Sequence, residues 1–390
     1  MTNARTALTV RRPTPPCACH PSFYNQSPLT AMLLIIDDKI PFMRGQAEKL
    51  GNTVYLSGSA ITADDVRRAD ALIIRTRTRC DRRLLEGSSV RFVATATIGH
   101  DHIDTHYLSH AGIGWINCPG CNAGSVAQYV ESSLLLLQAA GRTDLRNATL
   151  GIVGVGHVGS QVALMARRRG IRLLLCDPPR HEGRVRHSHL PVKAEECTAS
   201  LADVAAEADI ITLHTPLTTT GPDATLHLAG EDFLNRLRRK PILINAGRGE
   251  LTDTEALLRA LDRALVSEAV IDTWEGEPHI DRRLLDRAFL ATPHIAGYSA
   301  DGKANGTRMA LQAVARHFGV KADFLIEPPQ LPAGFAYYPE LAGHLPALTG
   351  NDSDTIGHLR RYDPRRDSDA LKARPEDFER LRGNYPLRRE

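Results

Sequence analysis

The chain of 390 residues is long for a single hydrophobic core, so its length predicts two or three domains. Its composition, with 42% hydrophobic, 24% charged and 5% aromatic residues, is typical of a globular protein, and a net charge of +3 indicates no nucleic-acid partner. No apolar run reaches the ~18 residues that a transmembrane helix needs, so we expect no membrane association. Seven cysteines, an odd number, argue against a disulfide scaffold and favour a reducing, cytoplasmic location.

The N-terminal segment differs from the rest of the chain. Residues 1–31 contain no Asp or Glu and are rich in Pro, Ser and Thr. They lack the apolar core of a secretory signal. We interpret them as a disordered extension, or as the result of a start codon assigned too early, with Met32 opening the first strand.

From Met32 onward, short β-rich apolar runs alternate with helix-sized segments. This pattern is typical of parallel strands in βαβ units. The runs form two series separated by a helix at 125–142, so we predict an α/β fold with two Rossmann-like domains around a cleft. The first series comprises 33–37, 71–76, 91–97 and 113–118, and the second comprises 149–155, 172–177, 208–215, 241–247, 268–273 and 289–294.

A glycine-rich turn follows the first strand of the second series. Gly154, Gly156 and Gly159 match G-x-G-x-x-G between a strand and a helix, and the next strand ends in the acidic residue Asp177. This context predicts a dinucleotide site. Gly154 permits the tight turn, Gly156 lets the backbone approach the pyrophosphate, and Gly159 lets helix and strand pack closely.

The residues after the turn indicate which dinucleotide binds. The helix amides near His157 and Val158 are expected to face the phosphates. Asp177 is expected to accept hydrogen bonds from the ribose hydroxyls and to repel a 2′-phosphate, which favours NAD over NADP, although the nearby Arg180 argues the other way. We therefore expect NAD as cofactor, with the predicted cofactor set completed by Thr215, Asp272 and Gly297.

Three further stretches fall at the carboxyl ends of strands in the second series, where open α/β sheets bind ligands. They supply a cation, Arg248, a carboxylate, Glu277, and an imidazole, His294. This set suits oxidation of a 2-hydroxy acid, in which His294 takes the hydroxyl proton while hydride leaves C2 for the nicotinamide. Glu277 would orient the imidazole and Arg248 would bind the substrate carboxylate. Asp272 is placed to hold the nicotinamide carboxamide, and we expect no metal.

The order of these motifs, G-V-G-x-V-G, N-A-x-R-G, D-x-W-E-x-E-P and T-P-H-I-A-G, resembles the D-isomer-specific 2-hydroxyacid dehydrogenase family. The resemblance extends from Met32 to about Gly319 and implies that the three catalytic residues are Arg248, Glu277 and His294. It implies a flavodoxin-like substrate-binding domain and an NAD-binding Rossmann domain, and the resemblance of the C-terminal region to one branch of the family implies a small α+β dimerisation domain. After the extension at 1–31, these domains are expected at 32–127 plus 296–316, at 128–295, and at 317–390, the last possibly truncated.

The sequence around Tyr298 resembles one branch of that family, which acts on a phosphorylated 2-hydroxy acid in pyridoxine biosynthesis. Residues 95–104, 117–130, 173–180 and 294–307 carry this resemblance, and the C-terminal region shares it. It implies substrate contacts by Thr76, Thr97 and Tyr298, whose hydroxyl groups suit polyol and phosphate oxygens. It also implies that the protein forms a homodimer through its C-terminal domain.

Two alternative functions stay open. The protein could be another hydroxyacid dehydrogenase, acting on 3-phosphoglycerate or on glyoxylate and hydroxypyruvate, or an NAD(H)-sensing binding protein that retains the same three residues. The arginine-rich end, 358–390, also contains acidic residues, so we interpret it as a solvated or subunit-contact face. The segment 180–197 is interpreted as a surface loop.

Overall fold

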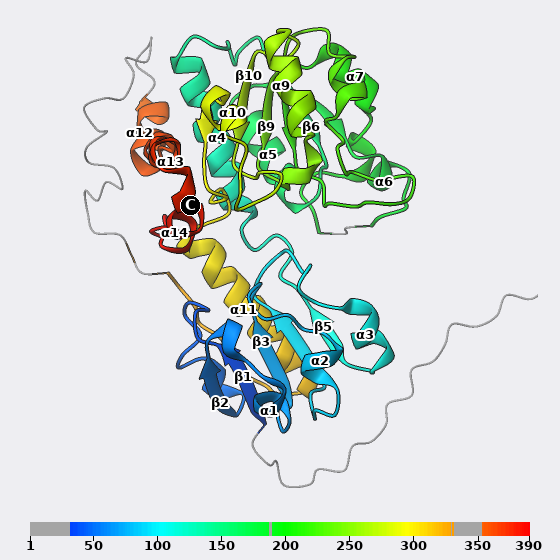
Figure 1. Ribbon diagram of the computed structural model, residues 1–390, viewed down its shortest axis with the longest axis vertical. Helices are drawn as coiled ribbons and strands as arrows, with labels where there is room; N and C mark the ends of the chain where they lie inside the picture. The colour runs from blue at the N-terminus through cyan, green and yellow to red at the C-terminus, as the bar shows by residue number, and fades with distance from the viewer. Residues whose placement is uncertain (1–31, 187–188, 329, 331–352) are drawn as a thin grey trace, which may run out of the picture.

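The computed structural model describes residues 32–186, 189–328, 330 and 353–390, so the predicted extension at 1–31 lies outside the described residues. Two sheets follow one another along the long axis of the molecule (Figure 1). One has five strands and the other has six, and every neighbouring pair within them is parallel. The prediction of two α/β domains is therefore confirmed.

The five-stranded sheet has the order β2-β1-β3-β4-β5. Its strands and helices are β1 (Leu33–Asp37), β2 (Asn52–Leu56), α1 (Ala63–Val66), β3 (Ala71–Ile74), α2 (Arg82–Leu85), β4 (Phe92–Thr95), α3 (Thr105–His110), β5 (Gly114–Ile116) and α11 (Ala300–Phe318). Leu34 and Ile36 of β1 pack with α11 on one face, whereas Ile35 packs with α1 to α3 on the other. The sequence prediction missed β2, because this edge strand is half exposed and has no continuous apolar run.

The six-stranded sheet has the order β11-β10-β9-β8-β6-β7. Its elements are α4 (Ala123–Ala139), β6 (Thr149–Val153), α5 (His157–Arg168), β7 (Arg172–Cys176), α6 (Pro178–His181), α7 (Leu201–Glu207), β8 (Ile210–Leu213), α8 (Glu231–Leu234), β9 (Ile242–Asn245), α9 (Thr254–Asp262), β10 (Glu268–Ile271), α10 (Arg282–Arg287) and β11 (Leu290–Ala291). Ile210 of β8 packs in the cluster that includes α4 and α5, and Ile211 packs in the cluster on the opposite face. From β6 the chain first adds β7 on one side of it and then crosses over to add β8 on the other side. The topological switch point therefore lies between β6 and β8, and such sheets bind ligands at this point.

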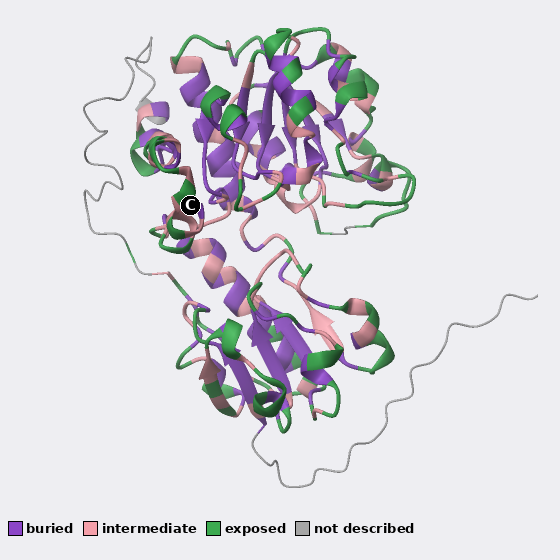
Figure 2. Ribbon diagram, viewed as in Figure 1, coloured by how far each residue is buried: buried purple, intermediate pink, exposed green. Residues whose placement is uncertain are grey.

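Two long helices join the parts of the molecule. The first five residues of α4, 123–127, precede the predicted boundary at 127/128, and α11 returns the chain to the first sheet (Figure 1). Figure 2 shows both sheets as buried layers beneath helices whose outer faces are exposed. The limits of the domains stay a prediction.

The C-terminal segment packs against the six-stranded sheet. Its helices are α12 (Ser353–Arg361), α13 (Arg365–Ala373) and α14 (Phe378–Gly383). Leu371 and Phe378 are buried in the core on one face of the sheet, and the hydroxyl of Ser368 accepts a hydrogen bond from the amide of Ala291, 3.0 Å away. α13 thus covers the edge strand β11, which would otherwise leave unpaired backbone groups. Residues 353–390 contain no strand, and residues 331–352 of the predicted α+β domain lie outside the described residues.

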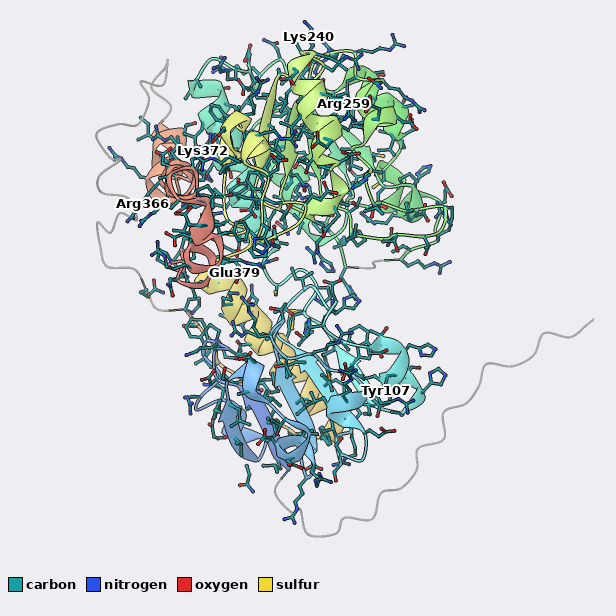
Figure 3. The ribbon with its side chains drawn as sticks, viewed as in Figure 1. Tyr107, Lys240, Arg259, Arg366, Lys372 and Glu379 are labelled. Carbon is teal, nitrogen blue, oxygen red and sulfur yellow. The ribbon has the colours of Figure 1, made fainter. Side chains whose placement is uncertain are left out.

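Parts of this segment are exposed, as predicted, and parts are not. Figure 3 labels Arg366 and Lys372 on α13 and Glu379 on α14, where the segment approaches the start of α11. Arg388, in contrast, is 0% exposed. The interpretation of the arginine-rich end as a solvated or subunit-contact face is therefore wrong for Arg388.

Two further sequence interpretations concern the surface and the cysteines. In the segment 180–197, residues 182–186 are exposed, as a surface loop requires, but Arg180 and Val192 are buried. The cysteines among the described residues are buried free thiols. None of the helices in the described part of the chain combines the length and the apolarity needed to cross a bilayer.

Candidate active site

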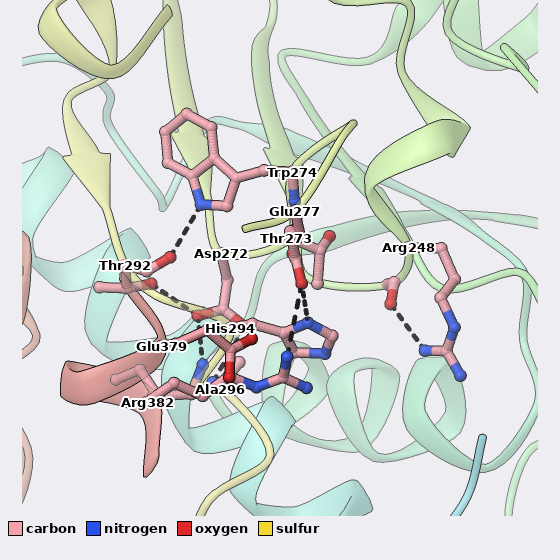
Figure 4. A network of polar contacts seen from close by, with 12 residues as sticks. Arg248, Asp272, Thr273, Trp274, Glu277, Thr292, His294, Ala296, Glu379 and Arg382 are labelled. Carbon is pink, nitrogen blue, oxygen red and sulfur yellow. Dashed lines mark hydrogen bonds and ion pairs between the residues drawn. The ribbon is translucent and has the colours of Figure 1, made fainter. Parts of the chain in front are cut away.

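The predicted catalytic residues follow three adjacent strands. Arg248 comes after β9, Glu277 after β10 and His294 after β11, and these strands are neighbours in the sheet. Because parallel strands end at the same edge, their following loops meet. Figure 4 shows the three side chains in one close-up, in which the carboxylate of Glu277 contacts both the imidazole of His294 and the guanidinium of the C-terminal Arg382.

His294 and Glu277 form a hydrogen-bonded pair. Nδ1 of His294 lies 2.8 Å from Oε2 of Glu277, and the other carboxylate oxygen accepts a hydrogen bond of 2.8 Å from the amide of Trp274. Burial alone would raise the pKa of Glu277, but the bond from His294, its charge and the Trp274 amide together lower it. An ionised carboxylate only accepts, so Nδ1 carries the hydrogen and Nε2 is the basic nitrogen.

Asp272 holds the loop that carries His294. Its buried carboxylate accepts hydrogen bonds from the hydroxyl of Thr292 (2.7 Å) and from the amides of Ile295 (2.8 Å) and Ala296 (3.0 Å). Its carbonyl accepts the amide of His294 at 2.8 Å. These bonds surround His294, whose φ of 56° is a left-handed conformation that costs about 1–3 kcal/mol in a non-glycine residue. The predicted nicotinamide contact of Asp272 stays a prediction.

Arg248 faces the other domain. A Cβ atom placed on Gly99, after β4 of the first sheet, would lie 3.0 Å from Nη2 of Arg248. Nη1 donates to the carbonyl of Gly247 at 2.9 Å. Among the described residues no carboxylate lies within ion-pair distance of this guanidinium, so its charge is available for an anion.

The three glycines have the geometry that a dinucleotide site requires. Gly154 has a φ of 85°, and a Cβ atom on Gly159 would lie 2.0 Å from the carbonyl oxygen of Gly154. A Cβ atom on Gly156 would meet nothing within 4 Å, so the space beside this backbone is open. Gly156 begins α5 without a side-chain cap, which leaves the first helix amides free to bind an anion.

Arg180 does not oppose the expected preference for NAD. Its guanidinium is buried and donates to the carbonyls of Val155 and Val192. It is therefore committed to the fold and cannot bind a 2′-phosphate without losing these bonds. Asp177 accepts the amide of Val155 at 2.8 Å and caps α6, which places its carboxylate beside the glycine-rich turn.

The other predicted cofactor residues surround the same turn. Thr215 has a buried hydroxyl with no hydrogen-bond partner among the described residues, which fits a missing ligand. Val158 packs into the core, so only its backbone is available, and the ring of His157 lies against Gly120. Gly297 lies so close to Asn122 that a Cβ atom there would be 2.1 Å from Nδ2. These features fit NAD, and the individual contacts stay predictions.

The predicted substrate residues come from both domains. Thr76 is exposed after β3, and the hydroxyl of Thr97, after β4, bonds to Thr95 Oγ1 (2.7 Å) and to the carbonyl of Gly99 (2.9 Å). Tyr298 lies just before α11. The loop of Gly99 also contacts Arg248, so Thr97 lies near the catalytic residues, whereas no contact of the described residues links Thr76 to them.

The sequence analysis did not predict that C-terminal residues hold the loop that follows His294. The guanidinium of Arg388 donates to the carbonyls of Ile295 (3.1 Å) and Tyr298 (2.8 Å), and also to that of Ala296. It therefore holds the loop that follows His294. No local pattern could have separated Arg388 from the other arginines of this segment, because its burial depends on the packing of distant residues.

Replacing Arg388 by methionine is expected to destabilise the protein by about 3 kcal/mol or more, since each buried carbonyl left unpaired costs about 1–3 kcal/mol. The measurement is the free energy of unfolding from urea titration. Arg380→Met on α14, where the arginine is half exposed and pairs with Asp377, provides the control. Equal stability of the two variants would show that the Arg388 bonds contribute nothing.

Comparisons with known proteins agree with this geometry. Residues 128–296 match the model of the D-isomer specific 2-hydroxyacid dehydrogenase, NAD binding domain. The erythronate-4-phosphate dehydrogenase of Bacteroides fragilis is 50% identical over 92% of this chain and 97% of its own length. That of Porphyromonas gingivalis is 41% identical over 92% of this chain and 94% of its own length.

Solved structures extend the likeness to the fold. The D-lactate dehydrogenase of Aquifex aeolicus, in complex with NAD and lactic acid, superposes with a TM-score of 0.60 at 24% identity, covering 74% of this chain and 96% of its own. At that identity the likeness shows the fold alone. The family match and the two relatives, taken with the glycine-rich turn and the His294–Glu277 pair, show that the chain belongs to the D-isomer specific 2-hydroxyacid dehydrogenase family, with NAD as cofactor.

Proposed function

We propose that this protein oxidises 4-phospho-D-erythronate to 2-oxo-3-hydroxy-4-phosphobutanoate with NAD, in pyridoxal 5′-phosphate biosynthesis. The observation that carries the proposal is the His294–Glu277 pair at the same edge of the sheet as the glycine-rich turn. It occurs in a chain half identical to a relative named erythronate-4-phosphate dehydrogenase. The geometry supports hydride transfer, and the relatives support the choice of substrate.

His294 serves as the acid–base group of this reaction. Its Nε2 accepts the proton of the C2 hydroxyl. NAD, when bound at the glycine-rich turn, would supply the acceptor for the hydride that leaves C2. Glu277 fixes the tautomer of the imidazole and stabilises the imidazolium that forms. In the reverse direction the imidazolium returns the proton to the oxygen of the 2-oxo group.

Arg248 orients the substrate for this step. Its guanidinium carries a fork of donors that suits a carboxylate, and no carboxylate of the described residues neutralises it. Binding of the substrate C1 carboxylate there would present C2 to His294. The same cation would polarise the carbonyl that forms at C2.

The test of the substrate is the rate of NADH formation, measured by absorbance with 4-phospho-D-erythronate, 3-phosphoglycerate and D-glycerate. We expect kcat/KM to be at least ~10-fold higher for 4-phospho-D-erythronate, since sites with placed polar groups discriminate strongly. A preference for 3-phosphoglycerate would contradict the assignment of the substrate. Binding of NADH without turnover of any of the three acids would instead support the NAD(H)-sensing alternative.

Two finer features are part of the proposal. We propose a homodimer formed through the C-terminal segment, which the resemblance to the family's branch supports. We also propose a cytoplasmic location, supported by the buried free thiols, which suit a reducing compartment. Sedimentation of the purified protein tests the first, and fractionation of cells tests the second.

A further inference from the structure

A group of cations surrounds Tyr298, four residues after the catalytic histidine. Arg75 follows β3, Lys303 lies in the first turn of α11, and Arg382 lies on α14. We call Arg75, Tyr298, Lys303 and Arg382 the Tyr298 cluster. Its members come from three separate stretches of sequence, around residues 75, 298–303 and 382, so only the fold brings these stretches together.

Arg382 links the cluster to the catalytic pair. Its Nη1 lies 3.6 Å from Oε2 of Glu277, the same oxygen that binds His294 (Figure 4). Its Nε is buried and has no hydrogen-bond partner among the described residues. A guanidinium with an unused buried donor is costly unless a ligand accepts from it.

The ammonium group of Lys303 lies over the ring of Tyr298. Its Nζ lies 4.2 Å from the centre of the Tyr298 ring, and no carboxylate of the described part of the chain lies within ion-pair distance of it. Burial lowers the pKa of Lys303, with Tyr298 acting against this and the charges of Arg75 and Arg382 adding to it. Both arginines are thus close enough for their charges to act on the ammonium group of Lys303.

The carboxylates near the cluster do not balance its charge. Asp37 accepts from Arg75 through both oxygens, at 3.2 Å each. Glu277 is committed to His294 and to the amide of Trp274. Glu379, on the same helix as Arg382, pairs with Arg77. The buried Nε donor of Arg382 is therefore left without an acceptor among the described residues, and Lys303 has no ion pair among them.

We propose that Lys303 and Arg382, supported by Arg75, bind the phosphate of the substrate and so determine the preference for a phosphorylated 2-hydroxy acid. This inference rests on the proposed function. A phosphate carries close to two negative charges and accepts several hydrogen bonds, which matches a convergent lysine and arginine. Arg248 lies on the far side of His294 in Figure 4 and is left for the C1 carboxylate, so the two anionic ends of the substrate have separate cations.

The position of Arg382 assigns a role to the C-terminal segment. α14 packs through Phe378 into the core of the NAD-binding domain, which fixes the helix that carries Arg382. The segment would thus supply part of the substrate site of its own chain. Tyr385, whose ring centre lies 6.1 Å from that of Tyr298 in an edge-on arrangement, closes the same side of the cluster.

The experiment compares kcat/KM for 4-phospho-D-erythronate and unphosphorylated D-erythronate in Lys303→Met, Arg382→Gln and the unaltered protein. Each variant is expected to lose ~10- to 100-fold with the phosphorylated acid, the contribution of one charged hydrogen bond. Lys303→Met should change less than ~3-fold with D-erythronate. Arg382→Gln also loses the contact with Glu277, so its loss with the phosphorylated acid should exceed its loss with D-erythronate by ~10-fold. Arg380→Gln removes a cation from the exposed face of the same helix and should leave both values unchanged.

An equal loss with both acids would overturn the inference, because it would mean that the two residues only position the catalytic pair. Unchanged kcat/KM in both variants would overturn it as well. The pair 3-phosphoglycerate and D-glycerate is measured in parallel. The unaltered protein could have a higher kcat/KM for 3-phosphoglycerate than for 4-phospho-D-erythronate, while the variants lose the preference for 3-phosphoglycerate over D-glycerate. In that case the proposed substrate is wrong but the phosphate site stands.

Discussion

Replacing His294 by alanine is expected to lower kcat by ~10²- to 10⁴-fold, the contribution of a positioned general acid–base group. The hydroxyl proton would then have to leave to water while hydride departs from C2. NAD binding should change little, since no described contact places the His294 side chain in the glycine-rich turn. The measurements are NADH formation at saturating substrate and NADH binding by fluorescence.

A matched substitution separates this effect from general damage to the loop. His279 is exposed two residues after Glu277, and no side-chain hydrogen bond of it is found among the described residues. His279→Ala should therefore retain kcat within ~2-fold. A His294→Ala variant that retained more than a tenth of the activity would contradict the role of His294 as acid–base group.

Replacing Glu277 by glutamine is expected to lower kcat by ~10²- to 10³-fold with little change in substrate binding. The amide of glutamine can donate as well as accept, so it no longer fixes the hydrogen on Nδ1 of His294. It also cannot stabilise the imidazolium that forms during oxidation. Steady-state kinetics in both reaction directions would measure the loss.

The chain contains a suitable control for this variant. Glu275 accepts a hydrogen bond of 2.6 Å from Nε2 of His227, a second Glu–His pair that lies outside the candidate site. Glu275→Gln removes the same type of bond and should leave kcat within ~2-fold. Equal losses in Glu277→Gln and Glu275→Gln would contradict a specific role of the first pair.

The pH dependence of the Glu277 pair has a defined sign. The pKa of Glu277 in the folded protein lies below its ordinary 4.5, because the favourable contacts with His294 and Trp274 outweigh the effect of burial. The stabilisation that the pair provides is therefore fully present above pH 4.5 and is lost as the pH falls through the lowered pKa. At neutral pH the carboxylate is ionised and able to hold the imidazolium.

The phosphate site and the catalytic pair share one residue, Arg382. Because it approaches both Glu277 and Tyr298, substrate binding at the cluster would also position a charge beside the catalytic pair. The segment that carries Arg382 also supplies Arg388, which holds the carbonyls of the loop after His294. The C-terminal residues thus support the site in two ways, through a buried structural arginine and through one that faces the substrate.

The sequence by itself determined the order of most of the parallel strands along the chain and the dinucleotide turn, and it predicted that Arg248, Glu277 and His294 follow strands at one edge of the sheet. These features depend on local patterns: apolar runs of strand length, glycines at fixed spacing after a strand, and polar residues at strand ends. Arg248, Glu277 and His294 could be predicted because parallel strands of one sheet end at a common edge. The edge strand β2 was missed, since its NTVYL run has no apolar pattern that distinguishes it.

Only the tertiary structure decided what the arginines do. Arg180, Arg382 and Arg388 are chemically alike, and each has other charged residues within two positions in the sequence. Their roles differ because burial and hydrogen-bond partners come from residues far away along the chain: the carbonyl of Val192 for Arg180, Glu277 for Arg382, and the loop from Ile295 for Arg388. Such long-range partners leave no periodic signal in the sequence, because the free energy that buries a charge is set by the whole fold.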